Sequence, residues 1–269
     1  MKKTHQSVER ALEILLSFSP YNREINGTEI GKNLGLHPST VNRLLHVISG
    51  YGFLRQDPVT KKFRLGQSVA QLGRAMTQSY RERIVEIAKP EIDALRDVIG
   101  DTISLELMLD DATTVAYRAR GPHRIQVLFD PGERFPIHVA VGARAILAFS
   151  APEVVDRFIQ GKLTRFTRYT ITDPDLLRAE LKKIRNRGYS FDNKELDVHI
   201  QAVAAPVFDH EKKPVAAVLL AAPVFRMKVH LKTNAIAQVQ ETAKKISDLI
   251  SADQQLGGSG ETSGVGKKR

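Results

Sequence analysis

The chain has 269 residues, 42% of them hydrophobic, and it contains no cysteine, which excludes disulfides, thiolate zinc sites and cysteine nucleophiles. No apolar run reaches the roughly 18–20 residues that a membrane-spanning helix requires. The formal charge of +10 and the isoelectric point near 9.8 favour a polyanionic partner.

The N-terminal region predicts a helix over residues 7–18. The preceding residues 1–6 lack the apolar core of a signal peptide, so we expect a cytoplasmic protein. Ser7 is placed to cap the helix. Its apolar face is expected to hold Val8, Ala11, Leu12, Leu15 and Leu16.

Two further helices follow in the pattern of a helix-turn-helix. The first covers residues 28–34, is capped by Thr28 and is closed by Gly35, and the second covers residues 38–48 and begins with Pro38. The apolar stripe Val41, Leu44, Leu45 and Ile48 anchors the second helix, with Leu12, Leu15, Leu16, Ile30, Leu34 and Leu36 completing a small core. The opposite face of this second helix carries polar residues that can reach base edges or phosphates: Ser39, Thr40, Asn42, Arg43 and His46.

A short basic hairpin comes directly after this helix. Residues 53–56 and 62–65 predict strands joined by the loop 57–61. In this position the hairpin is a wing, whose Arg55, Lys61, Lys62 and Arg64 would lie along the DNA backbone. Residues 1–79 hold 11 Lys and Arg against 5 Asp and Glu, an excess of 6 that is more than half of the total. The alternative is a solvated basic hairpin.

Helical periodicity continues through residues 66–80 and 81–99. Pro90 predicts a kink or a break within the second run. Helices between a small head and a larger domain are suited to holding a dimer together, and a plain covalent linker is the alternative.

From residue 101 the period changes to two. Strands are expected at 102–109 and 113–119 around a turn at Asp110–Asp111, at 125–129, at 200–208 and at 214–222. Helices are expected at 141–149, 152–160, 174–187 and 229–251. Antiparallel strands flanked by helices indicate an α+β domain. The Gly/Ser-rich tail from residue 255 is expected to be flexible.

Signatures of catalysis and of metal binding are missing from the sequence. It has no His-Glu-x-x-His, no nucleophile elbow and no phosphate-binding glycine loop. The runs 197–199 and 209–211 combine Asp, His and Glu but have no second ligand pair at metal spacing. His138 reads as a structural hydrogen bonder. We therefore expect no catalytic residue, no metal and no cofactor. The competing hypothesis is a small-molecule-binding enzyme or sensor whose N-terminal helices mediate only protein contacts.

The ordered set of these segments resembles the IclR family of bacterial transcriptional regulators over nearly the whole length. The residues that carry the resemblance are 7–12, 36–45, 50–54 and 63–66 in the first part, and 135–138, Gly142, 187–189, Glu195 and 204–209 in the second. The resemblance implies a winged helix-turn-helix domain over residues 1–66, linker and dimerisation helices over 67–99, a GAF-like effector-binding domain over 100–254 and a tail over 255–269. It also implies homodimers or dimers of dimers.

An effector pocket against the sheet is also implied by the resemblance. It would be bounded by Gly142 and Ala143 and by the carboxylate of Asp192. The three strand positions that bind a carboxylate in the family carry Ala202, Leu219 and Ala221, which cannot compensate a buried charge. The effector is then more apolar than a keto acid, aromatic or sugar-derived, or its charge is met by Arg118. The alternative is that these positions are sheet core.

The function expected from these features is a ligand-responsive regulator that binds double-stranded operator DNA. Two recognition helices of a homodimer would enter the major grooves of a pseudo-palindromic site. Asn42 and Arg43 would read base edges, with Ser39 and Thr40 near phosphates or bases. A small organic effector would change the affinity for DNA. The resemblance favours a repressor of a catabolic operon, and the residues alone leave activation open.

Overall fold

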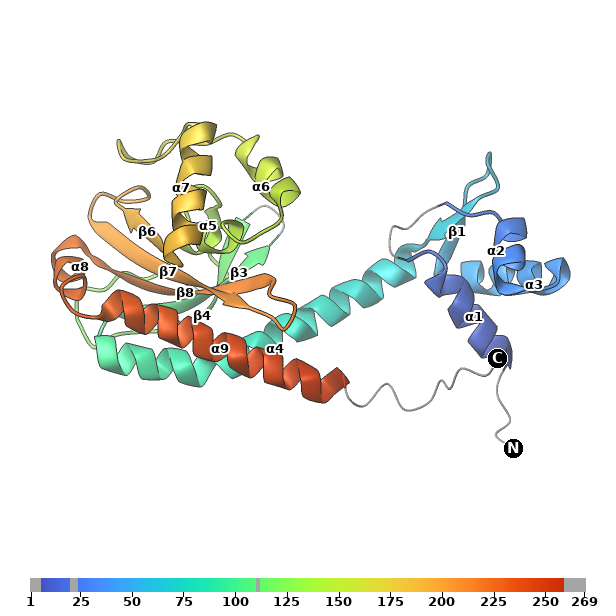
Figure 1. Cartoon of the computed structure of the whole chain (residues 1–269), viewed down its shortest axis with the longest axis horizontal. Helices are drawn as coiled ribbons and strands as arrows, with labels where there is room; N and C mark the ends of the chain where they lie inside the picture. Colours follow the sequence, from blue (N-terminus) through green and yellow to red (C-terminus); the bar gives the residue numbers. More distant parts are fainter. Residues whose placement is uncertain (1–5, 20–23, 110–111, 259–269) are drawn as a thin grey trace. The chain divides into compact units, whose positions relative to one another are not determined.

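The computed structural model describes residues 6–19, 24–109 and 112–258, and the chain divides into two units, residues 1–80 and 81–269. Figure 1 shows the helices and strands of both units.

The N-terminal unit has three helices followed by a two-stranded antiparallel sheet. The elements are α1 (Gln6–Leu16), α2 (Gly27–Leu34), α3 (Pro38–Gly50), β1 (Leu54–Gln56) and β2 (Phe63–Leu65). Ile25 adds an isolated bridge to Phe63, which ties the segment before α2 to the hairpin. The predicted winged helix-turn-helix is confirmed.

The core of this unit uses only part of the predicted face of α1, where Ala11 and Leu15 pack against it. Ile14 and Phe18 are fully buried, whereas Leu12 and Leu16 are 54% and 70% exposed. The helix carries two apolar stripes, and periodicity alone does not say which one meets α2 and α3. The rest of the predicted core is correct: Ile30, Val41, Leu44, Leu45 and Ile48 are buried, with Leu15, Leu34 and Leu36 packed against them.

The helix boundaries also differ from the predicted caps. Asn26, not Thr28, caps α2, and its side chain accepts a hydrogen bond from the backbone N–H of Glu29 at 2.8 Å. Ser7 lies inside α1, which begins at Gln6. At the other end of α2, Gly35 adopts φ +64° and donates its N–H to the carbonyl of Gly31, which closes the helix as expected.

The next helix, α4 (Gln67–Ile99), is continuous over 33 residues. The predicted continuation from residues 66–80 into 81–99 is therefore confirmed, whereas a break at Pro90, one of the two alternatives predicted there, is wrong. The neighbours of Pro90 on the same helix, Ala88 and Ile92, are fully buried. This packing compensates for the single backbone hydrogen bond that the proline removes.

The C-terminal unit is built on a six-stranded antiparallel sheet in the order β5-β4-β3-β8-β7-β6. Its strands are β3 (Thr102–Leu109), β4 (Ala112–Ala119), β5 (Arg134–Pro136), β6 (Ser190–Asn193), β7 (Ile200–Phe208) and β8 (Pro214–Pro223). The helices are α5 (Val141–Leu147), α6 (Pro152–Ile159), α7 (Pro174–Arg187), α8 (Val224–His230) and α9 (Ala235–Gly258). The predicted α+β arrangement is confirmed.

Helices cover both faces of this sheet. Helix α5 packs on the central strands β3, β8 and β7, with α6 and α7 outside it, and α9 covers the opposite face (Figure 1). Buried residues of α5 and α7 form one core with the edge strands, among them Ala143, Leu147, Leu181 and Ile184.

Several predicted elements of this unit need correction. Residues 125–129 form no strand, because β5 already pairs with the outer edge of β4 and the segment instead packs Val127 over the sheet. Strands β5 and β6 were not predicted. The single helix expected at 229–251 is two helices, α8 and α9, and α5 ends at Leu147 rather than at residue 149.

The predicted tail is also shorter, since α9 continues to Gly258. The rest of the tail and the turn at Asp110–Asp111 lie outside the described residues. Within the described ranges, no helix is both long and apolar enough to cross a bilayer.

Candidate functional site

The outer face of α3 carries the polar residues expected to meet DNA. Asn42, Arg43 and His46 are exposed, while the stripe from Val41 to Ile48 is buried on the other side. Among the described residues, Arg43 has no ion-pair partner. Its charge is therefore free to meet an anion.

The start of α3 is organised by His37. This residue caps the helix, and its Nδ1 lies 2.8 Å from Ser39 Oγ and accepts the backbone N–H of Ser39 at 3.4 Å. Ser39 is exposed and Thr40 is half-buried. The backbone N–H groups of Ser39, Thr40 and Val41 are thus all taken by His37, and the group that the first turn presents outward is the Ser39 hydroxyl, which can bind a phosphate.

A shallow cavity of about 450 Å³ separates α3 from the hairpin. Asn42 and His46 line it from the helix, and Gln56 and Lys61 line it from the hairpin. Asn42 leans toward the start of α2, where a Cβ built on Gly27 would lie 3.6 Å from its Oδ1. The helix and the hairpin thus present their polar groups to one shared concave surface.

The hairpin places two arginines directly opposite each other. Arg55 and Arg64 are register partners of β1 and β2, and both are exposed. Like charges in this position destabilise a hairpin, so the pair indicates an external anion. Lys61 and Lys62 are exposed at the turn, where the backbone N–H groups of Thr60 and Val59 bind Asp57 and lower the pKa of its carboxyl.

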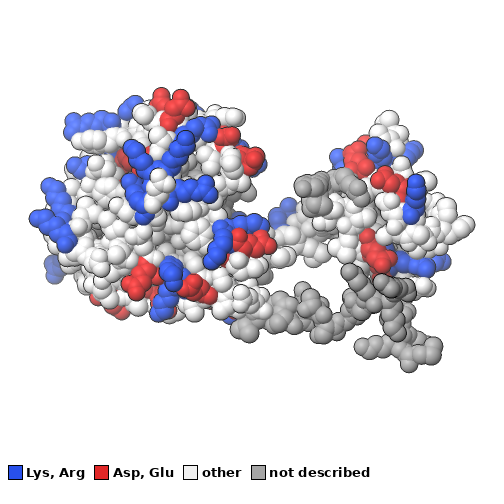
Figure 2. Space-filling view, viewed as in Figure 1, with Lys and Arg blue, Asp and Glu red and all other residues white. Residues whose placement is uncertain are grey.

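Basic residues are not confined to the N-terminal unit. On the face seen in Figure 2, Lys and Arg side chains of the C-terminal unit gather over α7, and acidic and basic side chains alternate on the N-terminal unit. A DNA-binding assignment therefore depends on the geometry of α3 and the hairpin more than on total charge.

In the C-terminal unit, the predicted effector residues share the sheet face under α5. Asp192, Ala202 and Ala221 occupy one face because they are successive register partners on β6, β7 and β8. Ala202, Ala221 and Leu219 pack against Val127 and against Val141 of α5 in one buried cluster. Gly142 and Ala143 are buried on α5 itself. The face is apolar at these strand positions.

Glu106 of β3 lies beside the first turn of α5. It is 2% exposed, and a Cβ built on Gly142 would come within 2.2 Å of its Oε2, so a side chain at position 142 would push the carboxyl group of Glu106 aside. Burial raises the pKa of Glu106 to about 7, and a weak interaction with the Thr113 hydroxyl offsets this only in part. A carboxyl group therefore faces the helix start that was expected to bound the effector.

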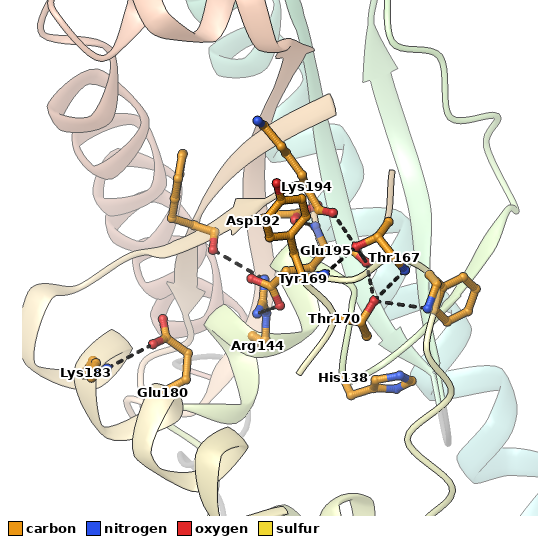
Figure 3. Close-up of polar contacts among 12 residues, drawn as sticks. His138, Arg144, Thr167, Tyr169, Thr170, Glu180, Lys183, Asp192, Lys194 and Glu195 are labelled. Carbon is orange, nitrogen blue, oxygen red and sulfur yellow. Dashed lines mark hydrogen bonds and ion pairs between the residues drawn. The ribbon is translucent and has the colours of Figure 1, made fainter. Parts of the chain in front are cut away.

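Asp192 belongs to a buried polar network at the other side of the same face (Figure 3). Arg144 of α5 donates to Glu195 at 2.6 Å, and Asp192 accepts the backbone N–H of Glu195 at 2.7 Å. Thr170 donates to the carbonyl of Glu195 at 2.7 Å. Burial raises the pKa of Asp192 to about 6, although the Glu195 N–H and the charge of Arg144 oppose it.

Arg118 is already engaged by its surroundings. Its side chain donates to the carbonyl of Phe129 at 2.7 Å and to Asp130 at 2.9 Å. It shares the α5 side of the sheet with its register partner Ser104. These contacts hold the 125–130 segment over the sheet and leave the charge of Arg118 balanced.

A cavity of about 630 Å³ opens at one end of this face. Its walls include the segment 125–129, the paired strand ends Ile200 and Pro223, and α8. Asp101, which is 1% exposed, fixes α8 by binding Arg226 and His230, and Arg226 also donates to the carbonyl of Ile125. Although burial opposes it, hydrogen bonds from His230 and Arg226 lower the pKa of Asp101.

Sequence reasoning missed several polar residues of this face. They are Thr102, Ser104 and Glu106 on β3, Arg144 on α5 and Glu195 after β6. The sequence of β3 did contain a signal, because polar and apolar residues alternate along it. The polar side of such a strand normally faces solvent, but in this protein it is buried.

The histidines form no metal cluster in the ranges described, where no group of three His, Cys, Asp or Glu is placed to hold an ion. His138 Nε2 lies 2.8 Å from the carbonyl oxygen of Thr164, next to the network in Figure 3. This contact is the structural hydrogen bond expected of it.

Comparisons with known proteins bear on both units. A model of the IclR helix-turn-helix domain matches residues 7–58, and a model of the bacterial transcriptional regulator IclR C-terminal domain matches residues 77–248. The HTH-type transcriptional regulator BhcR of Paracoccus denitrificans is 31% identical over 90% of this chain and 86% of its own length. The transcriptional repressor IclR of Escherichia coli is 27% identical over 90% of this chain and 89% of its length.

A solved structure has the same fold. It is an IclR homologue of Microbacterium hydrocarbonoxydans complexed with 4-hydroxybenzoate, with a TM-score of 0.57 and 22% identity over 93% of this chain and 99% of that one. These relatives are described as regulators rather than enzymes, which confirms that part of the prediction.

Proposed function

The chain belongs to the IclR family of transcriptional regulators, and on that premise we propose that α3 and the β1–β2 hairpin bind operator DNA while the sheet face under α5 binds a small organic effector. The observation that carries the DNA-binding surface is the exposed Arg43 on α3, which has no ion-pair partner among the described residues, together with the facing Arg55 and Arg64 of the hairpin. Such a regulator acts in the cytoplasm, where it meets the chromosome.

Each polar residue of the DNA surface has a role in this proposal. Asn42 and Arg43 read base edges in the major groove, because amide and guanidinium groups can bind purines in a bidentate manner. His46, one turn further along α3, contacts base edges or phosphates next to them. The remaining residues, Ser39, Thr40, Arg55, Lys61, Lys62 and Arg64, bind the phosphate backbone.

The proposed active form is a homodimer, or a dimer of such dimers. Within the N-terminal unit, Val8, Leu12 and Leu16 form an exposed apolar row along α1, and Leu72 and Met76 are exposed on α4. Exposed rows of large apolar residues on regular helices indicate an interface. A twofold dimer would present two α3 helices to a pseudo-palindromic operator.

The proposed function also divides the chain into domains. Residues 1–66 would form the DNA-binding domain, 67–99 the linker and dimerisation helix, and 100–254 a GAF-like sensor domain. The effector site lies around Gly142, Ala143, Asp192, Ala202, Leu219 and Ala221, with Arg118 holding the covering segment. A solved relative is complexed with 4-hydroxybenzoate, which supports a small organic ligand.

The direction of regulation proposed is repression of a catabolic operon, relieved or altered when the effector binds. The description of the Escherichia coli relative as a repressor supports this direction. Because binding of DNA and effector is coupled, each changes the affinity for the other by the same factor.

A gel-shift titration with DNA flanking the encoding gene tests the DNA-binding role. We expect saturable binding that resists excess unrelated DNA and weakens steeply between two salt concentrations, since several phosphates are neutralised. Binding that is equal for unrelated DNA at both salt concentrations would contradict an operator-specific role.

A further inference from the structure

We propose that the row of Thr102, Ser104 and Glu106 on β3 binds the hydroxyl groups of an uncharged, ring-shaped effector; this rests on the proposed function, because it names the ligand class of the same sensor face.

The row consists of alternate residues of one strand, so its three side chains point to the same side of the sheet. Thr102 and Ser104 are fully buried, and Glu106 is 2% exposed. Within the part of the chain that the structure describes, Thr102 Oγ1, Ser104 Oγ and Glu106 Oε2 have no hydrogen-bond partner. Buried polar atoms are nearly always paired in folded proteins, so three unpaired oxygens on one strand indicate partners that are supplied from outside the chain.

The row leads inward from the cavity of about 630 Å³. Ile200 and Pro223, which line the cavity, are register partners, and one step further along the same face Thr102 is the partner of Ala221. Ser104 and Glu106 follow, beside Leu219 and Ala217. Val127 lines the cavity and also packs on this face against Leu219, the register partner of Ser104, so a ligand that enters from the cavity would displace Val127 to reach Ser104.

The neighbouring strands supply an apolar surface of short side chains, from which only Leu219 projects further. Ala202, Ala204, Ala217 and Ala221 are buried on the same face, and none of them has a side chain longer than a methyl group. The flat face of a ring fits against such a surface, with its substituted edge toward β3.

Charge on this face excludes an anionic ligand. Arg144 is paired with Glu195, and Arg118 is paired with Asp130. The carboxyl groups of Glu106 and Asp192 face the same space, so a carboxylate would meet like charge. A hydroxyl group can donate to Glu106 and accept from Ser104. Burial raises the pKa of Glu106 to about 7, which lets its protonated form donate as well.

Two matched pairs of probes test this ligand class on the full chain. One pair is D-glucose and D-gluconate, and the other is 4-hydroxybenzyl alcohol and 4-hydroxybenzoate. Isothermal titration calorimetry should show that the neutral member of at least one pair binds about tenfold or more tightly than its anion. The pair that responds tells whether the ring is a sugar or a phenol.

Three variants connect the preference to the row. Ser104→Ala should weaken binding of the neutral probe about tenfold, because its hydroxyl group loses a partner. Glu106→Gln should narrow the preference for the neutral probe over its anion, since the anion then meets one carboxylate, Asp192, instead of two. Ser247→Ala is the control, because this buried hydroxyl lies on α9, on the opposite face of the sheet, and its loss should leave the preference unchanged.

Three outcomes would overturn the inference: tighter binding of the anion in both pairs, no binding of any probe, or wild-type affinities in both β3 variants. The last outcome would mean that ordered water satisfies the three oxygens. The same protein preparation is tested in the gel shift. Specific DNA binding there keeps the proposed function intact if the inference fails, and its absence overturns the proposed function separately.

Discussion

Arg43 projects from the exposed side of α3 with its charge unpaired among the described residues. We expect Arg43→Ala to weaken operator binding by about 1–3 kcal/mol and to leave binding to unrelated DNA nearly unchanged, because the residue reads bases. Gel shifts with both DNAs measure this. Lys182→Ala, which removes an exposed charge from α7, should change neither affinity. Equal losses on both DNAs would assign Arg43 to phosphate binding instead.

Glu106 makes stability depend on pH in an unusual direction for a carboxyl group. Its pKa rises from 4.5 to about 7 on folding, so the folded state holds a proton that the unfolded state releases. The stabilisation is complete below about pH 4.5 and is lost as the pH rises to about 7. Glu106→Gln should remove this loss, which amounts to roughly 3–4 kcal/mol when the group is fully deprotonated.

Denaturant titrations at pH 5 and pH 8 measure the effect. The difference in unfolding free energy between the wild type and Glu106→Gln should not be the same at pH 5 as at pH 8. Glu153→Gln, an exposed change on α6, should follow the wild type at both. An identical pH dependence for wild type and Glu106→Gln would show that Glu106 is solvated in the folded protein.

At the level of single residues, the sequence predicts the DNA face better than the effector face. The stripe from Val41 to Ile48 fixes which side of α3 is buried, so the exposure of Asn42 and Arg43 follows from periodicity. The burial of Glu106 does not follow, because alternation along a strand shows that two faces differ without showing which one is covered.

The β1–β2 hairpin combines two roles in one pair of residues. Arg55 and Arg64 face each other as like charges in the free protein, and in the proposed complex both contact phosphates. Arg55→Ala or Arg64→Ala should each lower the slope of log affinity against log salt by about one unit. Each should also raise the stability of the free protein by about 0.2–1 kcal/mol, as measured by thermal unfolding. An unchanged salt slope in both variants would remove the hairpin from the DNA interface.

The apolar row on α1 gives a test of the dimer. Leu12→Gln with Leu16→Gln should shift the sedimentation coefficient from dimer toward monomer, because two large side chains leave the interface while helix propensity is kept. Leu176→Gln on α7 is the matched control, since this residue is 64% exposed in the other unit. A dimer unaffected by the double change would place the interface elsewhere.

Elements were predictable where local signals were strong. Pro38 and Gly35 frame the turn between α2 and α3, and the apolar runs of β7 and β8 continue over many residues. Strand β6 has four residues and β5 has three, too few for a periodic signal, and their pairing depends on partners far away in sequence. The face of α1 depends on tertiary packing in the same way.

At the scale of the whole chain, the two units have separate hydrophobic cores. Phe18 lies in the core of the N-terminal unit and Ile184 in that of the C-terminal unit. We expect Phe18→Ala to destabilise the first unit by about 3–5 kcal/mol and Ile184→Ala to destabilise the second by about 2–5 kcal/mol.

Differential scanning calorimetry should therefore show two transitions, each of which moves with its own variant. Movement of a single common transition in both variants would show that the units unfold together.

The division into a helical head and a mixed sheet domain followed from the change of period at residue 101. The strand order did not, because β3 pairs with β8 across more than a hundred residues and no local pattern encodes that choice. Net charge was also weak evidence for which unit binds DNA, since basic side chains also gather on the C-terminal unit (Figure 2).

The facing Arg55 and Arg64 have a practical consequence at the bench. If the hairpin binds phosphates as proposed, we expect it to retain cellular nucleic acid through lysis and chromatography. The chain has no tryptophan and six tyrosines, so its own ultraviolet absorbance is weak and a small carry-over would dominate the spectrum. Washing with concentrated salt on the column, followed by a heparin step, would give protein whose concentration can be measured reliably.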